Sequence, residues 1–215
     1  MADAVRGRAL MAGKRGRPAA DRAKVRSDLA EQVLSAASSD ILTGRFADLS
    51  IEQLTRQAGI SRSKFYVYFQ DKDDLIRAFF SAVWGETKAA QDAWWRLDGT
   101  ATQGDLRAAL TGIVRTYQPY RALMAAVYDH ALHSQAIRVE VDRVISENIA
   151  QLAKHIRAGQ RNGYVASALL PVETAAWLTW MAERTQHSLP PDEDPAPHIE
   201  AYTDIVWHTL YAEPR

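Results

Sequence analysis

A short basic segment contains the residues of this 215-residue chain best suited to binding a partner. Arg62, Ser63 and Lys64 follow Ser61, a residue type that favours the N-cap position of a helix. The major groove of duplex DNA admits a helix, and its bases present acceptors to which arginine and lysine donate hydrogen bonds. An exposed first turn of this composition therefore predicts that Arg62, Ser63 and Lys64 approach base edges.

The residues after that turn predict two further faces of the same helix. Phe65 and Phe69 lie four positions apart, so both are expected to point into a core. Tyr66 and Tyr68 lie on other faces, where their hydroxyl groups could donate to phosphates. For any one basic residue here, an incidental surface charge is the better explanation. The ordered stretch as a whole favours DNA recognition.

A preceding helix would position this segment. Ser50 and Gln53 have the spacing of a capping box, and Gly59 can end the helix in a left-handed conformation. Helix-turn-helix proteins place the N-terminal residues of their second helix against DNA bases. The N-terminus of the first helix, at the backbone of Ser50, is expected to hold a phosphate.

Apolar residues spaced every four positions predict an earlier helix over about 23–44, ended by Gly44. They are Val25, Leu29, Val33, Ala37 and Ile41. A three-helix DNA-binding unit over residues 23–77 would result. The next helix is expected to begin at Asp71 or Asp73 and to continue to the tryptophans at 94 and 95.

Residues 1–22 are rich in arginine, glycine and alanine, lack apolar periodicity and predict a disordered basic arm. Arg15 and Arg17 flank a glycine, as in the core of an AT-hook, and such a segment can enter a narrow minor groove. The simpler alternative is a solvated basic tail that adds nonspecific affinity. This arm also explains how a chain with 26 basic and 26 acidic residues could still bind DNA at one end.

Beyond the linking helix the pattern remains helical, with runs at about 104–117, 119–132, 134–162, 171–188 and 196–211. No strand alternation appears, so the sequence predicts an all-α protein with a helical bundle over residues 78–215. Its aromatic and polar side chains are candidates for a ligand site between helices, with simple core packing as the alternative. The candidates are Trp84, Trp94, Tyr117, Tyr120, Met124, Tyr128, Trp177, Thr179, Trp180 and Met181.

Composition excludes several classes of site. The chain has no cysteine, which removes disulfides and thiolate metal ligands. No apolar run is long enough for a membrane helix and no signal peptide is evident, so a cytoplasmic protein is expected. His130 and His133 share a helical face beside Asp129, yet two histidines do not make a metal site. Neither a cofactor nor a catalytic constellation is predicted, and a small helical enzyme is the weakest interpretation.

The segment AGISRSKFYVYFQDKDDLI resembles the signature of the TetR family of transcriptional regulators. The matching residues are Gly59, Ile60, Ser61, Phe65, Tyr66, Tyr68, Phe69, Lys72 and Leu75. The resemblance implies that Lys72 contacts a phosphate, that an effector binds in the bundle, and that the last two helices form a homodimer interface. Four aromatic residues in those helices agree weakly with an interface: Trp177, Trp180, Trp207 and Tyr211.

Together these features predict a regulator that binds an operator in double-stranded DNA as a homodimer. The leading hypothesis is a repressor that a small apolar or amphipathic effector releases from the operator. A constitutive DNA-binding regulator with a solid bundle is the alternative.

Overall fold

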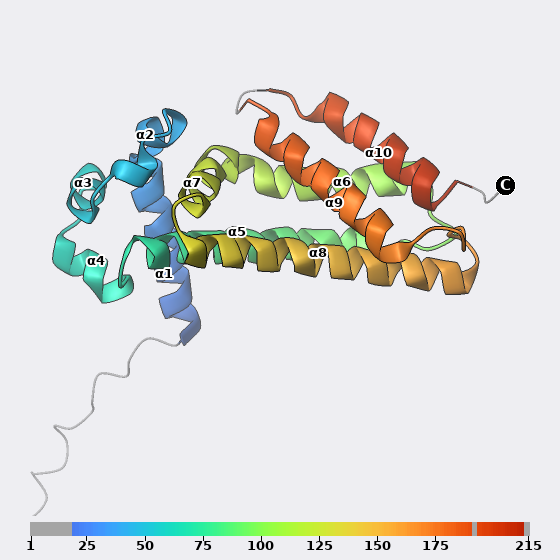
Figure 1. Ribbon diagram of the computed structural model, residues 1–215, viewed down its shortest axis with the longest axis horizontal. Helices are drawn as coiled ribbons and strands as arrows, with labels where there is room; N and C mark the ends of the chain where they lie inside the picture. Colours follow the sequence, from blue (N-terminus) through green and yellow to red (C-terminus); the bar gives the residue numbers. More distant parts are fainter. Residues whose placement is uncertain (1–18, 191–192, 213–215) are drawn as a thin grey trace, which may run out of the picture.

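A computed structural model describes residues 19–190 and 193–212, and every regular element in this part of the chain is a helix (Figure 1). The all-α prediction is confirmed. The first elements form a compact head: α1 (Ala19–Ala36), α2 (Ser38–Leu42), α3 (Ile51–Gln57) and α4 (Arg62–Tyr68). A short 3-10 helix, Phe46–Asp48, joins α2 to α3. Arg15 and Arg17 lie outside the described residues, and residues 19–22 of the predicted arm begin α1.

The prediction of one helix over 23–44 was wrong in its continuity. The chain leaves the helical conformation at Ala37, where φ is −95° and ψ is 11°, and the five-residue α2 then runs in a new direction. Ala37 and Ile41 are both buried, so the four-residue spacing continues across the break and conceals it. Contacts of α2 with α7 (Arg121–Ala131) account for the change of direction.

Local signals fix the two helices of the helix-turn-helix. Ser50 accepts a hydrogen bond from the backbone N–H of Gln53, whose side chain accepts one from the N–H of Ser50, completing the predicted capping box. Gly59 has a φ of +65°, the left-handed conformation that glycine adopts at little cost. Ser61 then caps α4 by accepting from the N–H of Lys64.

The body begins with α5 (Lys72–Trp95), which leaves the head and runs beside α8 (Gln135–Asn162) along the molecule (Figure 1). The remaining helices are α6 (Gln103–Tyr117), α7, α9 (Pro171–Ser188) and α10 (Ala196–Leu210), with a 3-10 turn at Gln118–Tyr120. With 24 residues, α5 spans about 36 Å at 1.5 Å per residue.

One apolar core extends from the head into the body. Buried residues of α1, such as Leu29 and Val33, belong to the same cluster as Phe79 of α5 and Val144 of α8. A second cluster, around Trp94, fills the far end of the body. The helices α5 and α7 therefore share buried apolar contacts with the head.

Candidate DNA-binding face and effector cavity

The exposed face of α4 carries the residues predicted to read bases. Arg62, Ser63 and Lys64 are all exposed in the first turn of the helix. Phe65, directly after them, is fully buried, as is Phe69 at 1% exposure. The helix is therefore anchored from beneath by two aromatic rings while its basic turn remains open to a partner.

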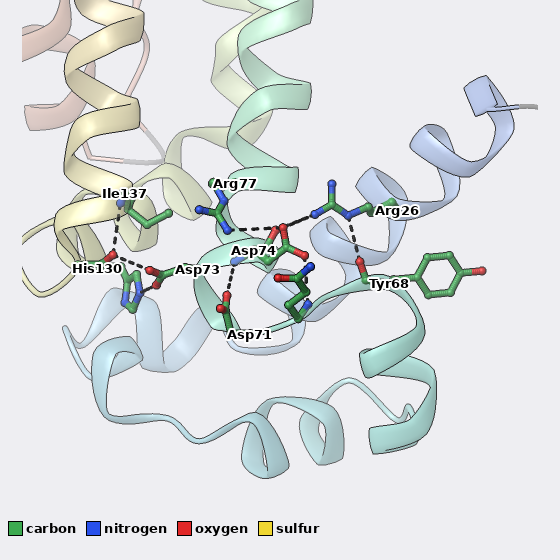
Figure 2. Close-up of polar contacts among 10 residues, drawn as sticks. Arg26, Tyr68, Asp71, Asp73, Asp74, Arg77, His130 and Ile137 are labelled. Atoms are coloured by element: carbon green, nitrogen blue, oxygen red, sulfur yellow. Dashed lines mark hydrogen bonds and ion pairs between the residues drawn. The ribbon is translucent and has the colours of Figure 1, made fainter.

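The two tyrosines of α4 differ in their surroundings. Tyr66 is 50% exposed and its ring meets the edge of Phe65 at a centroid distance of 5.5 Å. Tyr68 is half-buried, and Figure 2 shows its ring directed away from the neighbouring polar cluster. Both hydroxyl groups can thus be reached from outside the head.

The backbone N–H of Ser50 is not available in the way predicted. It donates to Oε1 of Gln53 at 2.8 Å as part of the capping box. The residue itself is exposed at the N-terminus of α3. A phosphate at this position would have to displace the Gln53 side chain or use the following N–H groups, so the specific prediction for the Ser50 backbone does not match this geometry.

Lys72, predicted to contact a phosphate, makes hydrogen bonds within the head. Its ammonium group donates to the backbone carbonyls of Phe46, Ala47 and Leu49 at 2.5, 2.9 and 3.2 Å. It also lies 4.4 Å from the centroid of the Phe46 ring. Burial lowers the pKa of Lys72, and the nearby carboxylates of Asp129 and Asp48 oppose that effect. Lys72 thus ties α5 to the end of the 3-10 helix while keeping an intermediate exposure, and its phosphate contact stays a prediction.

Lys72→Met is therefore expected to destabilise the fold by about 1–3 kcal/mol, because three carbonyls lose a charged donor. Urea unfolding of the full chain measures the change, with Lys64→Met as a control that removes an exposed lysine from the same head. If Lys72→Met left the free energy of unfolding unchanged but weakened binding to every DNA sequence equally, Lys72 would instead contact a phosphate.

A polar cluster joins α4, α1 and α5 at the base of the head (Figure 2). Arg26 of α1 donates from Nε to the carbonyl oxygen of Tyr68 at 3.0 Å and from Nη2 to Asp74 at 2.5 Å. The second carboxylate oxygen of Asp74 accepts from the backbone N–H of Gln70 at 3.1 Å. These bonds fix the end of the recognition helix to the start of α5.

Asp73 makes the corresponding connection from α5 to the body (Figure 2). Its Oδ1 lies 2.6 Å from Nε2 of His130 in α7, and its Oδ2 accepts from the hydroxyl of Ser134 at 2.7 Å. Ser134 is also the N-cap residue of α8. Burial alone would raise the pKa of Asp73, but the hydrogen bonds from Ser134 and His130 outweigh it and hold that pKa below its usual value. The carboxylate is therefore ionised at neutral pH.

The body encloses a cavity of about 120 Å³ between α5, α6, α7, α8, α9 and the start of α10. Six of the ten predicted ligand residues line it: Trp84, Trp94, Tyr117, Met124, Tyr128 and Thr179. Burial strongly raises the pKa of Tyr117 and of Tyr128, and the carboxylate of Glu183 adds to both shifts. The tyrosines therefore present neutral hydroxyl groups to the cavity.

The other four predicted ligand residues do not line this cavity. Trp177 and Trp180 are 79% and 51% exposed on the outer face of α9. Met181 packs against the second core cluster. Tyr120 lies near the head, where its hydroxyl donates to Glu86 at 3.1 Å. Residue type alone placed them in a pocket, but the helical rotation of α9 sends both tryptophans outward.

Two aromatic residues expected at an interface, Trp207 and Tyr211, are partly buried against the second core cluster. The rings of Trp207 and Tyr211 stack at a centroid distance of 5.4 Å. The hydroxyl of Tyr211 lies 2.6 Å from Nε2 of His155 and accepts from the indole N–H of Trp94 at 3.2 Å. These contacts pack both residues against the far end of the body, but each keeps an intermediate exposure, so their place at an interface stays a prediction.

Several polar cavity residues were missed from the sequence. Arg121, Asn148 and Glu183 all line the cavity, and Asn148 accepts a hydrogen bond from Gln91 at 2.9 Å. Charged residues on helices are mostly exposed, so the sequence did not predict that Arg121 or Glu183 lines a cavity. The only available signal was the helical spacing of Arg121 and Met124, which lie three positions apart on one face.

The histidine pair considered for a metal serves other contacts. His130 is bonded to Asp73, whereas His133 is exposed. Within the described residues, no group of three histidine or carboxylate side chains is arranged to hold a metal ion. None of the described helices is both long and apolar enough to cross a membrane.

An exposed basic helix on a helical head, joined to a helical body with an internal cavity, defines a helix-turn-helix transcriptional regulator. Residues 34–79 match the family described as "Bacterial regulatory proteins, tetR family". The helix-turn-helix part of the chain is therefore similar to that of TetR family regulators. The relatives considered below are transcriptional regulators and not enzymes.

Two mycobacterial regulators are similar over most of the chain. The HTH-type transcriptional regulator EthR of Mycolicibacterium smegmatis is 24% identical over 183 residues, covering 83% of this chain and 84% of the relative. EthR of Mycobacterium tuberculosis is 27% identical over 203 residues, covering 90% and 92%. The resemblance therefore extends beyond the head into the body.

Solved structures show the same fold at lower identity. The TetR family regulator PfmR from Thermus thermophilus has a TM-score of 0.68 at 15% identity, covering 84% of this chain and 99% of that one. FadR from Bacillus subtilis, solved in complex with stearoyl-CoA, has a TM-score of 0.66 at 13% identity, covering 84% and 98%.

Proposed function

We propose that this regulator is a repressor that binds its operator as a homodimer and is released by a small amphipathic effector. The observation that carries the DNA-binding part is the exposed turn of Arg62, Ser63 and Lys64 above buried Phe65. In this proposal those three residues approach base edges, while Tyr66 and Tyr68 hold phosphates. Arg15 and Arg17 add minor-groove or nonspecific affinity from the arm.

The division of labour follows the chain. Residues 23–77 would form the DNA-binding unit and residues 78–215 the effector-binding and dimerisation unit, with α5 crossing between them. Because the apolar core is shared across this boundary, we expect the two units to fold together as one cooperative unit. A structural change in one unit should then affect the other.

Arg62→Ala is expected to weaken operator binding by about 1–3 kcal/mol and to relax the preference at one operator position. The measurement is fluorescence anisotropy with the operator and with a set of single-base variants. Arg115→Ala, which removes an exposed arginine from α6, is the matched control. An equal loss of affinity for every DNA sequence would mean that Arg62 contacts only the backbone.

The proposed dimer surface lies on α9 and α10, which pack side by side on one face of the body (Figure 1). Trp177 and Trp180 are exposed there, together with Val172 of α9 and Ile205 of α10. Large exposed aromatic residues are unusual on a monomer and are typical of interface centres. Two heads held by one interface would bind two half-sites with paired affinity.

The proposed effector site is the cavity in the body. Its lining is largely apolar and aromatic with a few polar groups, as small-molecule sites usually are. FadR, a structural relative, was solved with the amphipathic molecule stearoyl-CoA, which supports an amphipathic effector for this fold. The cavity measures about 120 Å³, and in this proposal it widens when such a molecule binds.

Selection of bound sequences from a random DNA pool would test the regulator proposal, followed by titration of the selected operator with candidate effectors. A palindromic or repeated half-site is expected from a dimer, and effector binding should lower operator affinity. An effector can shift the equilibrium only if it binds the released state more tightly. Specific DNA binding that no compound alters would favour the constitutive alternative.

A further inference from the structure

The cavity contains a buried positive charge, that of Arg121, which forms no ion pair with the residues that the structure describes. Arg121 is only 7% exposed. Its Nη1 donates to the backbone carbonyl of Pro190 at 2.9 Å, while its buried Nε makes no hydrogen bond. Among the residues that the structure describes, Arg121 forms no ion pair.

This arrangement is costly unless something else binds there. A charged group buried without a counter-charge is strongly destabilising, and an unsatisfied buried donor adds to the cost. The planar guanidinium group offers parallel N–H donors that match a carboxylate. The unbonded Nε donor of Arg121 and the absence of an ion pair with any described residue therefore favour the same ligand group, a carboxylate.

We infer that the effector is an amphipathic carboxylate whose head group binds Arg121, an inference that rests on the proposed effector site. The apolar part of the molecule would lie among the neighbouring cavity residues Phe80, Trp84 and Met124. Arg121 begins α7, the helix that also holds Asp73 through His130, so the head group would bind at a helix connected directly to α5.

Glu183 supplies the opposing possibility. It lines the same cavity and accepts a hydrogen bond from the hydroxyl of Tyr128 at 3.4 Å. A carboxylate near tyrosine rings could favour a ligand with an amine. Glu183 already accepts a hydrogen bond from Tyr128, whereas the Nε of Arg121 makes no hydrogen bond. The geometry therefore favours a ligand with a carboxylate head group over one with an amine.

The test compares three probes with the same tail and different head groups: dodecanoate, methyl dodecanoate and dodecylamine. Calorimetric titration of the full chain, below the critical micelle concentrations and without DNA, gives the affinities. Dodecanoate is expected to bind about 10- to 100-fold more tightly than the ester, the range for hydrogen bonds to a charged group. The amine is expected to bind more weakly than the ester.

Three variants separate a head-group contact from a general effect on the fold. Arg121→Met should abolish the preference for the acid while retaining the affinity for the ester, which also shows that the cavity is intact. Arg121→Lys should keep part of the preference for dodecanoate over the ester, because lysine keeps the positive charge but lacks the paired N–H donors of the guanidinium group. Arg115→Met, at an exposed position of α6, should leave all three affinities unchanged.

Equal binding of acid and ester, tighter binding of the amine, no binding of any probe, or an acid preference that survives Arg121→Met would each overturn the inference. Its outcome is distinct from that of the proposed function. If dodecanoate binds through Arg121 but leaves operator affinity unchanged, the carboxylate site stands and release by this ligand class fails.

Discussion

Replacing both Trp177 and Trp180 by arginine is expected to convert the proposed homodimer into a monomer and to weaken operator binding by about 100-fold or more. The two tryptophans are 79% and 51% exposed, so the monomer itself should fold as before. In a dimer they would be buried at the centre of the interface, where aromatic anchors carry much of the binding free energy. Two arginines on each side would also place like charges against each other.

Light scattering coupled to size-exclusion chromatography gives the oligomeric state, and anisotropy with a two-half-site operator gives the affinity. Leu132→Arg is the control, because it adds an arginine at an apolar residue that is 78% exposed and lies at the end of α7, outside α9 and α10. A doubly substituted protein that remains a dimer would place the interface elsewhere. A monomer that binds the operator with undiminished affinity would show that one head is sufficient.

Local sequence signals were enough to predict the two short helices of the helix-turn-helix and the turn between them. The capping box of Ser50 and Gln53, the left-handed Gly59 and the inward pair Phe65 and Phe69 all depend on residues within four positions of one another. Such signals act before tertiary packing, so the sequence contains them in full. The break at Ala37 was not predicted, because buried apolar residues on both sides of it keep the same four-residue spacing.

The cavity was only partly predictable because its lining depends on contacts between distant segments. Arg121 is bonded to Pro190, 69 residues away, and Gln91 to Asn148, 57 residues away. No local pattern distinguishes these side chains from ordinary surface residues. Lys72 presents the same difficulty, since its three carbonyl partners are brought to it by the packing of the head.

The second large effect is expected from Asp73→Ala, which should uncouple the effector cavity from the DNA-binding head. Asp73 is bonded to His130 of α7 and to Ser134 at the start of α8. The same α7 helix lines the cavity through Met124 and Tyr128. A ligand that displaces α7 is therefore expected to shift α5 at Asp73. The next residue, Asp74, is bonded to Arg26, which in turn donates to the carbonyl of Tyr68 at the end of the recognition helix α4.

Coupling free energies between sites are typically about 1–3 kcal/mol, which corresponds to a change in operator affinity of about 5- to 150-fold. In Asp73→Ala this ratio is expected to fall close to one, while the effector affinity of the body changes little. The loss of two hydrogen bonds to a charged acceptor is also expected to destabilise the fold by about 2–3 kcal/mol. The measurement is operator affinity with and without saturating effector, made below the unfolding temperature of the variant.

Two further variants separate coupling from mere loss of stability. Asp142→Asn removes an exposed carboxylate from α8 and should leave both the response and the stability unchanged. Asp73→Asn can still accept one of the two hydrogen bonds and should give an intermediate response. Because the pKa of Asp73 lies below its usual value, its contribution is present at neutral pH and lost as the pH falls through that pKa. A full effector response in Asp73→Ala would instead mean that the apolar core shared by α1, α5 and α7 transmits the movement without this carboxylate.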